Sequence, residues 1–254
     1  MLHFEAAGAG PGLAFIHAGV ADSRMWDADF AEFARRFRVV RMDLRGFGRS
    51  PLVPGRFSHR DDVAEALRAA GLERATLVGC SFGSTVAVET ALAHPDLVEG
   101  LVLVSPSLGG GESEEMERFG EKEEALLERG DLDGATELNL RMWVDGPHRT
   151  PDQVAPELRE RVRVMQREAF AMELPEGVQV ARLEPPAEKR LDEIRVPTLV
   201  IIGALDVPYV LEASEQLARE VKAARRVVVA GAAHLPSLER PEAFRAILEE
   251  FLFP

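Results

Sequence analysis

Short apolar, β-branched runs alternate along the chain with segments whose apolar residues recur at helical spacing. This alternation is typical of βα units that build a mostly parallel sheet. The runs predict strands at residues 2–6, 13–17, 38–43, 75–79, 100–105, 197–203 and 226–230. We therefore predict an α/β protein with an open, twisted, mostly parallel sheet flanked by helices.

The helical spacing predicts helices at residues 58–70, at about 81–93 and from about residue 241 onward. The first begins with Ser58 and Asp61 at capping-box spacing. The second is expected to end before Pro95, because the residue that precedes a proline avoids helical backbone. The last places Phe244 and Leu248 on one face, which is typical of a helix packed on a core.

The strand pattern stops between about residues 108 and 190, where helical patterns replace it. Helices are predicted over 113–129, 134–144 and 156–172. A glycine triplet at 109–111 and two prolines at 185–186 bracket the segment, as expected at the edges of an insertion. We therefore predict a core made of residues 1–108 and 191–254, interrupted by a helical cap at residues 109–190.

Ser81 lies in the motif that most directly indicates a catalytic residue. The stretch LVGCSFGST carries an apolar strand into a Gly-x-Ser-x-Gly turn that opens a helix. The pattern alone is a weak signal, since it also occurs by chance, but a nucleophilic serine requires this strand-turn-helix context. Gly79 and Gly83 would leave room for a strained turn, and the Phe82 N–H would face a developing oxyanion. The alternative is an ordinary glycine-rich strand exit.

A serine nucleophile needs a base, and the base needs an acid that orients it. Asp206 follows PTLVIIGAL and His234 follows RRVVVAGAA, so each is expected on a loop that leaves a strand. Such loops converge at the carboxyl ends of parallel strands. The sequence therefore predicts Ser81, Asp206 and His234 as a catalytic triad in this chain order. The competing interpretations are a helix cap for Asp206 and a buried structural histidine for His234.

Five stretches along the chain resemble the α/β-hydrolase superfamily: FIHAG, MDLRGFGRS, GCSFG, VIIGALDVP and GAAHLPSLERPEAF. The resemblance covers nearly the whole chain and implies the α/β-hydrolase fold. It also implies that the backbone N–H of Gly19 is the second oxyanion donor, beside Phe82, with the Val20 N–H as the alternative. His17 ends a strand beside this loop and is expected to orient it by hydrogen bonding. Because relatives with epoxide hydrolase or dehalogenase activity have aspartate in place of Ser81, those activities are disfavoured.

Four side chains are predicted either to line the substrate pocket or to pack in the core: Trp26, Phe82, Met142 and Trp143. Val20 is predicted to line the pocket. Cys80 is expected to be a small core residue, because strand alternation turns it away from its neighbour Ser81. As the single cysteine, it excludes an internal disulfide and a cysteine-cluster zinc site. The histidines outside the triad show no ligand spacing. We therefore expect neither a metal nor a cofactor.

The formal net charge of −13 argues against nucleic acid as a partner, since such a surface repels phosphates. Residues 112–129 hold eight glutamates and three basic residues. A solvated helix face is the expected explanation, and attraction of a cationic substrate is the alternative. The N-terminal stretch MLHFEAAGAGPG lacks the features of a secretion signal, and no run approaches a membrane span. We expect a cytoplasmic monomer or homodimer that does not enter a membrane.

Together these features predict a serine hydrolase that cleaves a small-molecule carboxylic ester or lactone through an acyl-enzyme on Ser81. The same triad also serves C–C bond hydrolases, cofactor-free perhydrolases and aminopeptidases, and some proteins of this fold act as ligand sensors with slow turnover. The stretch LRMWVDGPHR, at 140–149, resembles the cap of enol-lactonase-like hydrolases and favours lactones. A nucleotide-binding protein is excluded, because neither a Gly-x-Gly-x-x-Gly motif nor a P-loop follows any predicted strand.

Overall fold

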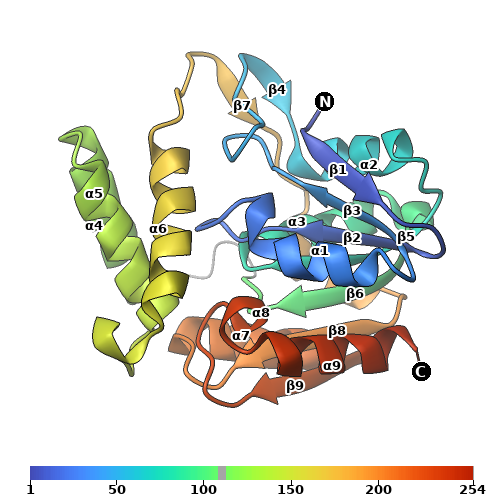
Figure 1. Ribbon diagram of the computed structural model, residues 1–254. Helices are drawn as coiled ribbons and strands as arrows, with labels where there is room; N and C mark the ends of the chain where they lie inside the picture. The colour runs from blue at the N-terminus through green and yellow to red at the C-terminus, as the bar shows by residue number, and fades with distance from the viewer. Residues whose placement is uncertain (108–112, 254) are drawn as a thin grey trace.

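Strands and helices alternate along the computed structural model, which describes residues 1–107 and 113–253 (Figure 1). The predicted core-cap boundary at 108/109 and the glycine triplet at 109–111 lie outside these residues. The strands are β1 (Phe4–Ala7), β2 (Gly12–Ile16), β3 (Arg38–Met42), β4 (Gly55–Phe57), β5 (Ala75–Cys80), β6 (Val98–Val104), β7 (Val178–Val180), β8 (Thr198–Gly203) and β9 (Ala224–Val229). The α-helices are α1 (Asp27–Phe33), α2 (His59–Ala69), α3 (Phe82–Ala93), α4 (Glu114–Glu128), α5 (Leu132–Asn139), α6 (Pro156–Phe170), α7 (Pro208–Glu220), α8 (Pro236–Glu239) and α9 (Pro241–Leu252).

Among the described residues, seven strands form one sheet in the order β1-β3-β2-β5-β6-β8-β9. Strand β1 pairs with β3 antiparallel, and the other neighbours are parallel. All seven predicted strands are confirmed, with each boundary within two residues. The predictions succeed because central strands of a parallel sheet are buried on both faces, so they read as continuous apolar runs. Strands β5 and β8 are buried along their whole length.

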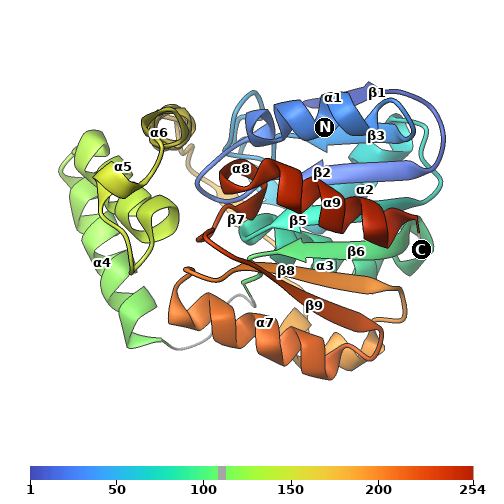
Figure 2. The same ribbon diagram turned by 60° about the horizontal axis from the view of Figure 1, so that its bottom comes forward.

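Helices cover both faces of this sheet, as Figures 1 and 2 show. One apolar cluster joins the sheet to α2, α3 and α7 through Leu67, Val86 and Leu217. A second cluster joins the opposite face to α1 and α9 through Phe33 and Phe244. The three-layer α/β architecture predicted from the alternation is therefore confirmed.

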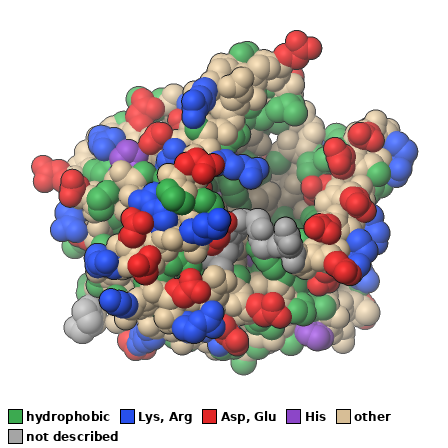
Figure 3. Space-filling view, turned by 180° about the vertical axis from the view of Figure 1, so that it is seen from behind, with side chains coloured by type: hydrophobic (Ala, Val, Ile, Leu, Met, Phe, Trp, Pro, Cys, Tyr) green, Lys and Arg blue, Asp and Glu red, His purple; other side chains and the backbone are tan. Residues whose placement is uncertain are grey.

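Helices α4, α5 and α6 follow β6 and pack on one another at the side of the sheet (Figures 1 and 2). The predicted helices 113–129 and 156–172 are confirmed as α4 and α6. The predicted helix 134–144 begins earlier, as α5, and continues as a π-helical stretch at Leu140–Asp145. The helix α4 carries the glutamates of the acidic segment from Glu114 onward and lies beside a hollow in the molecular surface (Figure 3).

Two short strands within the described residues were not predicted. Strand β7 lies in the segment predicted to be wholly helical, and it pairs with β4 to form a separate two-stranded sheet. Each has three residues, and most of them are exposed, so neither produces a readable alternation of apolar and polar positions. Downstream of β7, Leu183 and Ala187 pack into the core cluster. The chain thus returns to the core well before β8.

Two glycines allow α3 to approach the sheet at very short range. A Cβ on Gly83 would lie 2.4 Å from the Ile16 carbonyl oxygen and 2.6 Å from that of His17. A Cβ on Gly79 would lie 2.3 Å from the Gly83 carbonyl oxygen. Closely packed backbone atoms cannot move apart far enough to admit a Cβ at these distances. The prediction that these glycines make room where side chains would clash is confirmed.

The substitution Gly83→Ala is expected to destabilise the protein by at least about 1–3 kcal/mol, because α3 must move away from β2. The matched control is Gly120→Ala in α4, where an added Cβ meets nothing within 4 Å. This control is expected to gain up to about 1 kcal/mol, since alanine is the better helix former. Urea unfolding of both variants measures the two effects. A Gly83→Ala variant as stable as the wild type would contradict the close approach.

Candidate active site

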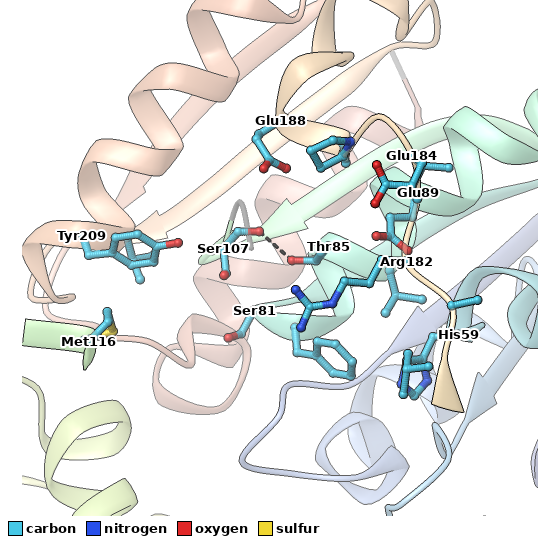
Figure 4. A pocket seen from close by; sticks show the side chains of 18 of the residues that line it. His59, Ser81, Thr85, Glu89, Ser107, Met116, Arg182, Glu184, Glu188 and Tyr209 are labelled. Atoms are coloured by element: carbon cyan, nitrogen blue, oxygen red, sulfur yellow. Dashed lines mark hydrogen bonds between the residues drawn. The ribbon is translucent and has the colours of Figure 1, made fainter. Parts of the chain in front are cut away.

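Ser81 stands at the sharp turn between β5 and α3. Its backbone has φ 52° and ψ −116°, in the left-handed half of conformational space that a residue with a side chain rarely adopts. The Ser81 N–H donates to the Val104 carbonyl at 2.8 Å, so the turn remains tied to β6. Such strain costs about 1–3 kcal/mol and persists only where the surrounding structure holds it. The result is a serine side chain that faces a cavity above the sheet (Figure 4).

Asp206 and His234 form a buried hydrogen-bonded pair. The Nδ1 atom of His234 lies 3.0 Å from both carboxylate oxygens of Asp206, and each residue is 1% exposed. The Val207 N–H also donates to Asp206 Oδ1, at 2.8 Å. Because a carboxylate accepts the Nδ1 proton, the neutral imidazole keeps a lone pair on Nε2, which can accept another proton. Asp206 is not the cap of α7, since Val207 occupies that position.

The loops that carry this pair are bound to each other. The Leu205 N–H donates to the Ala232 carbonyl at 2.9 Å. A Cβ on Gly203, at the end of β8, would lie only 1.9 Å from the Ala233 carbonyl oxygen. The histidine loop can therefore cross the end of β8 only because residue 203 is glycine. This crossing brings the acid and the base, which follow the neighbouring strands β8 and β9, within hydrogen-bonding distance of each other.

Glu239 holds the backbone on both sides of His234, a role that the sequence analysis missed. Its carboxylate accepts from the Ala233 N–H at 2.9 Å and from the Leu235 N–H at 3.1 Å. It also pairs at 2.7 Å with Arg149, from the segment that follows the π-helical stretch. The two side chains are 3% and 13% exposed, so the pair is largely shielded from water. A buried ion pair thus links the inserted helical segment to the histidine loop.

Gly19 and Phe82 lie side by side near Ser81. A Cβ on Gly19 would be 3.6 Å from the Phe82 Cβ. As the first residue of α3, Phe82 has an N–H with no acceptor one helical turn earlier, and the positive end of the helix dipole lies there. Both residues line cavities that Ser81 also lines. Two backbone N–H donors can therefore face one point beside the serine.

His17 braces the loop that carries Gly19. The Leu44 N–H donates to His17 Nε2 at 2.9 Å, which leaves the proton on Nδ1. That Nδ1–H donates to the Ala18 carbonyl at 2.8 Å. Complete burial lowers the pKa of His17, so the ring stays neutral and keeps this tautomer. The expected hydrogen bond from His17 to the loop is confirmed.

Two cavities meet at Ser81. The larger, of about 1070 Å³, is lined by Ser81, His234 and the residues of Figure 4. The smaller, of about 370 Å³, is lined by Ser81, Gly19 and Val20. Trp143 lines both cavities, and its ring packs against that of His234 at a tilt of 40°, with the centroids 4.6 Å apart. An ester held at Ser81 would thus have room for one group on each side.

Trp26 and Met142 line neither of the cavities at Ser81. For Trp26 the core alternative is confirmed: it is 0% exposed and packs between Phe15 and Phe244, with centroid distances of 5.0 and 5.9 Å. Met142 lines neither of the two cavities at Ser81 and packs instead against the Val207 and Val210 cluster. A wide apolar side chain suits a core and a pocket equally, so its type alone does not separate them.

Within residues 1–107 and 113–253, no group of three or more His, Cys, Asp or Glu side chains could hold a metal ion. No helix in the same ranges is long and apolar enough to cross a bilayer. Cys80 is buried in the second core cluster, as predicted, and burial raises the pKa of its thiol.

Arg182, Tyr209 and His59 also line the larger cavity (Figure 4) and escaped the sequence analysis. None lies in a motif, and each comes from a segment remote from Ser81 in the chain. Desolvation lowers the pKa of His59 to about 4, so this ring is neutral at pH 7. Its edge-to-face contact with Phe82, at 5.1 Å, places an uncharged wall beside the serine turn.

The substitution Arg149→Met is expected to destabilise the protein by about 3 kcal/mol, because it leaves the buried Glu239 carboxylate without its partner. The matched control is Arg225→Met, which removes an exposed ion pair with Glu250 and is expected to cost less than about 1 kcal/mol. Urea unfolding provides both values. Equal losses in the two variants would contradict a structural role for the Arg149–Glu239 pair.

The lowered pKa of His59 predicts a dependence of stability on pH. The unfolded chain binds a proton near the ordinary histidine pKa of 6.5, whereas the folded protein does so only near 4. The contribution of neutral His59 is thus complete above about pH 6.5 and is lost as the pH falls toward 4. The substitution His59→Gln should reduce the stability lost between pH 8 and pH 5 by about 1–2 kcal/mol. The exposed His148→Gln is the control, and an identical loss in both variants would contradict the shift.

Comparisons with known proteins show the family to which the chain belongs. The family model described as the alpha/beta hydrolase fold matches residues 11–241. The chain is 30% identical over 256 residues to a pimeloyl-[acyl-carrier protein] methyl ester esterase of Chromobacterium violaceum, with 99% of this chain and 98% of the relative covered. The structure of a hydrolase from Pseudomonas aeruginosa PA01 has a TM-score of 0.81 and 30% identity, covering 100% of this chain and 94% of that one. A thermophilic esterase from Thermogutta terrifontis has a TM-score of 0.81 and 28% identity, covering 99% and 92%.

The match to the family model extends from β2 to the start of α9, and so includes the serine turn and the loops of Asp206 and His234. The sheet order, the turn at Ser81 and the crossing of the two loops at Gly203 are features of the chain itself. The chain belongs to the α/β-hydrolase family and is a hydrolase.

Proposed function

We propose that the protein hydrolyses a carboxylic ester or lactone through an acyl-enzyme formed on Ser81. The observation that carries this proposal is the buried Asp206–His234 pair, with 3.0 Å between the carboxylate oxygens and Nδ1, on the cavity that Ser81 lines. A histidine oriented in this way presents the Nε2 lone pair that a serine nucleophile requires. The named esterases among the relatives support an ester as the substrate.

In the first half of the reaction, His234 Nε2 takes the proton of the Ser81 hydroxyl while Oγ attacks the carbonyl carbon. The carbonyl oxygen becomes an oxyanion that accepts hydrogen bonds from the Gly19 and Phe82 N–H groups. Asp206 stabilises the imidazolium that forms. The tetrahedral intermediate then collapses, and the bond between the carbonyl carbon and the alkoxy oxygen breaks. His234 gives its proton to the leaving alkoxide, and the acyl group stays on Ser81.

In the second half, His234 takes a proton from water, and the resulting hydroxide attacks the acyl carbon. The same two N–H donors stabilise the second oxyanion. The intermediate releases the carboxylic acid, and His234 returns its proton to the Ser81 oxygen. Overall, one ester and one water give one carboxylic acid and one alcohol. A lactone and one water give a single hydroxy acid.

We further propose that residues 109–190 act as a cap over this site. Support comes from Trp143, which packs against His234, and from the Arg149–Glu239 pair. Both contacts join the inserted segment to the histidine loop. A cap limits the access of water and shapes the cavity around the ester. A small-molecule substrate suits a site enclosed in this way.

The substitution Ser81→Ala tests the proposed chemistry. The variant is expected to fold normally and to lose about a million-fold in turnover of a p-nitrophenyl ester, because no other group replaces the nucleophile. Wild-type protein should also react covalently with a fluorophosphonate probe, and Ser81→Ala should not. The control is Ser113→Ala, whose side chain forms no cap hydrogen bond at α4 and lies outside both cavities.

A Ser81→Ala variant that keeps a tenth of the wild-type turnover would rule out covalent catalysis on this serine. Probe labelling of the wild type without multiple turnovers would instead favour a ligand sensor. Parallel assays on p-nitrophenyl acyl esters and on lactones of matched chain length determine which substrate class the cavity accepts.

A further inference from the structure

The larger cavity contains one strongly basic side chain. Among its described lining residues, and among those of the smaller cavity, Arg182 is the sole lysine or arginine. His59 cannot take its place, since that ring is neutral at pH 7. Figure 4 shows the Arg182 guanidinium extending toward Ser81. Four glutamates line the same cavity, Glu89, Glu117, Glu184 and Glu188, so Arg182 is the one basic group among acidic ones in this described lining.

Arg182 has no ionic partner of its own within residues 1–107 and 113–253, where no carboxylate lies within 4 Å of it. The positive charge of Arg182 acts on the carboxylate of Glu89. Burial raises the pKa of Glu89, and the charges of Arg60 and Arg182 act against that increase. Glu89 is already paired with Arg60, at 3.5 Å. An arginine left unpaired in a cavity has five N–H donors available to a ligand.

The backbone on both sides of Arg182 is fixed. The Ala181 N–H donates to the Phe57 carbonyl at 2.6 Å, and Arg60 donates to the Ala181 carbonyl at 3.0 Å. On the other side, Leu183 is buried in the core, and its backbone is hydrogen-bonded to the Glu89 carboxylate. The Arg60–Glu89 pair thus clamps residues 181 and 183, so the fold itself directs the side chain between them into the cavity.

We propose that Arg182 binds a carboxylate carried by the ester, and so selects monoesters of dicarboxylic acids or esters of hydroxy acids. This proposal rests on the proposed function and deepens it. A guanidinium binds a carboxylate through two parallel charge-assisted hydrogen bonds, which a neutral chain end cannot form. The carboxylate lies on the acyl part or on the alcohol part of the ester, according to which part enters the larger cavity.

Acidic side chains at the end of the cavity remote from Ser81 limit how far that carboxylate extends. Glu184 and Glu188 line the same cavity, and Figure 4 shows their carboxylates at the end remote from Ser81. A carboxylate that reached past Arg182 would meet these like charges, which is unfavourable. Short diacid monoesters are therefore preferred over long ones.

The test compares kcat/KM for esters that differ in charge and share their shape. The acyl series is monomethyl glutarate, its neutral amide analogue methyl 4-carbamoylbutanoate, and the cationic methyl 4-aminobutanoate. The alcohol series is 3-acetoxypropanoate and its neutral counterpart, propyl acetate. Monomethyl succinate, adipate and pimelate vary the length. The variants are Arg182→Gln, Arg182→Lys and, as control for the change in net charge, Arg68→Gln, which is exposed on α2 and lines neither cavity.

The wild type is expected to prefer the anionic member of one series over its neutral analogue by at least about 10-fold. Arg182→Gln should lower that preference by about 10- to 100-fold, chiefly through KM, and Arg182→Lys should keep part of it. Arg68→Gln should leave it unchanged. Raising the salt concentration should weaken the preference, since the guanidinium is exposed.

Equal losses on anionic and neutral esters in Arg182→Gln would overturn the proposal, because they would indicate a structural role. Wild-type preference for methyl 4-aminobutanoate would also overturn it and would assign the selectivity to the glutamates. If the wild type turns over anionic and neutral esters equally well, this proposal is overturned and the proposed function is not. Failure to turn over any ester would overturn both.

Discussion

The strained turn at Ser81 is the constraint on which the rest of the site depends. A serine with φ 52° cannot hold that conformation alone, so the neighbouring backbone must hold it. The hydrogen bond to Val104 ties the turn to β6, and the close approach of Gly83 to Ile16 ties the start of α3 to β2. Any side chain at Gly83 would separate these elements. The hydroxyl therefore stands above the sheet because three strands and one helix meet there at backbone contact distance.

The acid and the base depend on a second close approach, at Gly203. The histidine loop crosses the end of β8 there and brings His234 to 3.0 Å from Asp206. Glu239 then fixes the backbone on both sides of the imidazole. A buried carboxylate is unfavourable unless it is paired, and its partner, Arg149, comes from the inserted segment. The packing of the helices at the side of the sheet is thereby linked to the orientation of His234.

Charge is distributed unevenly around the cavity. The protein is acidic overall, and α4 carries many glutamates, yet the side chain that extends toward Ser81 in the larger cavity is Arg182. Its position follows from a neighbouring pair, Arg60 and Glu89, which holds the backbone and satisfies its own charges. Glutamates also line this cavity, so the net charge does not reveal where a single basic group lies within it.

The sequence by itself determined the central strands, the α/β architecture and the positions of Ser81, Asp206 and His234 at strand ends. These features are local, because buried strands are continuous apolar runs and the turn at Ser81 needs glycines at fixed spacing. Only the tertiary structure decided which side chains face the cavity. Trp26 and Trp143 have the same side chain. The first is enclosed by Phe15 and Phe244, and the second packs against His234. Contacts such as Arg149–Glu239 join residues far apart in the chain, so they depend on how loops and helices pack, which no short stretch of sequence encodes.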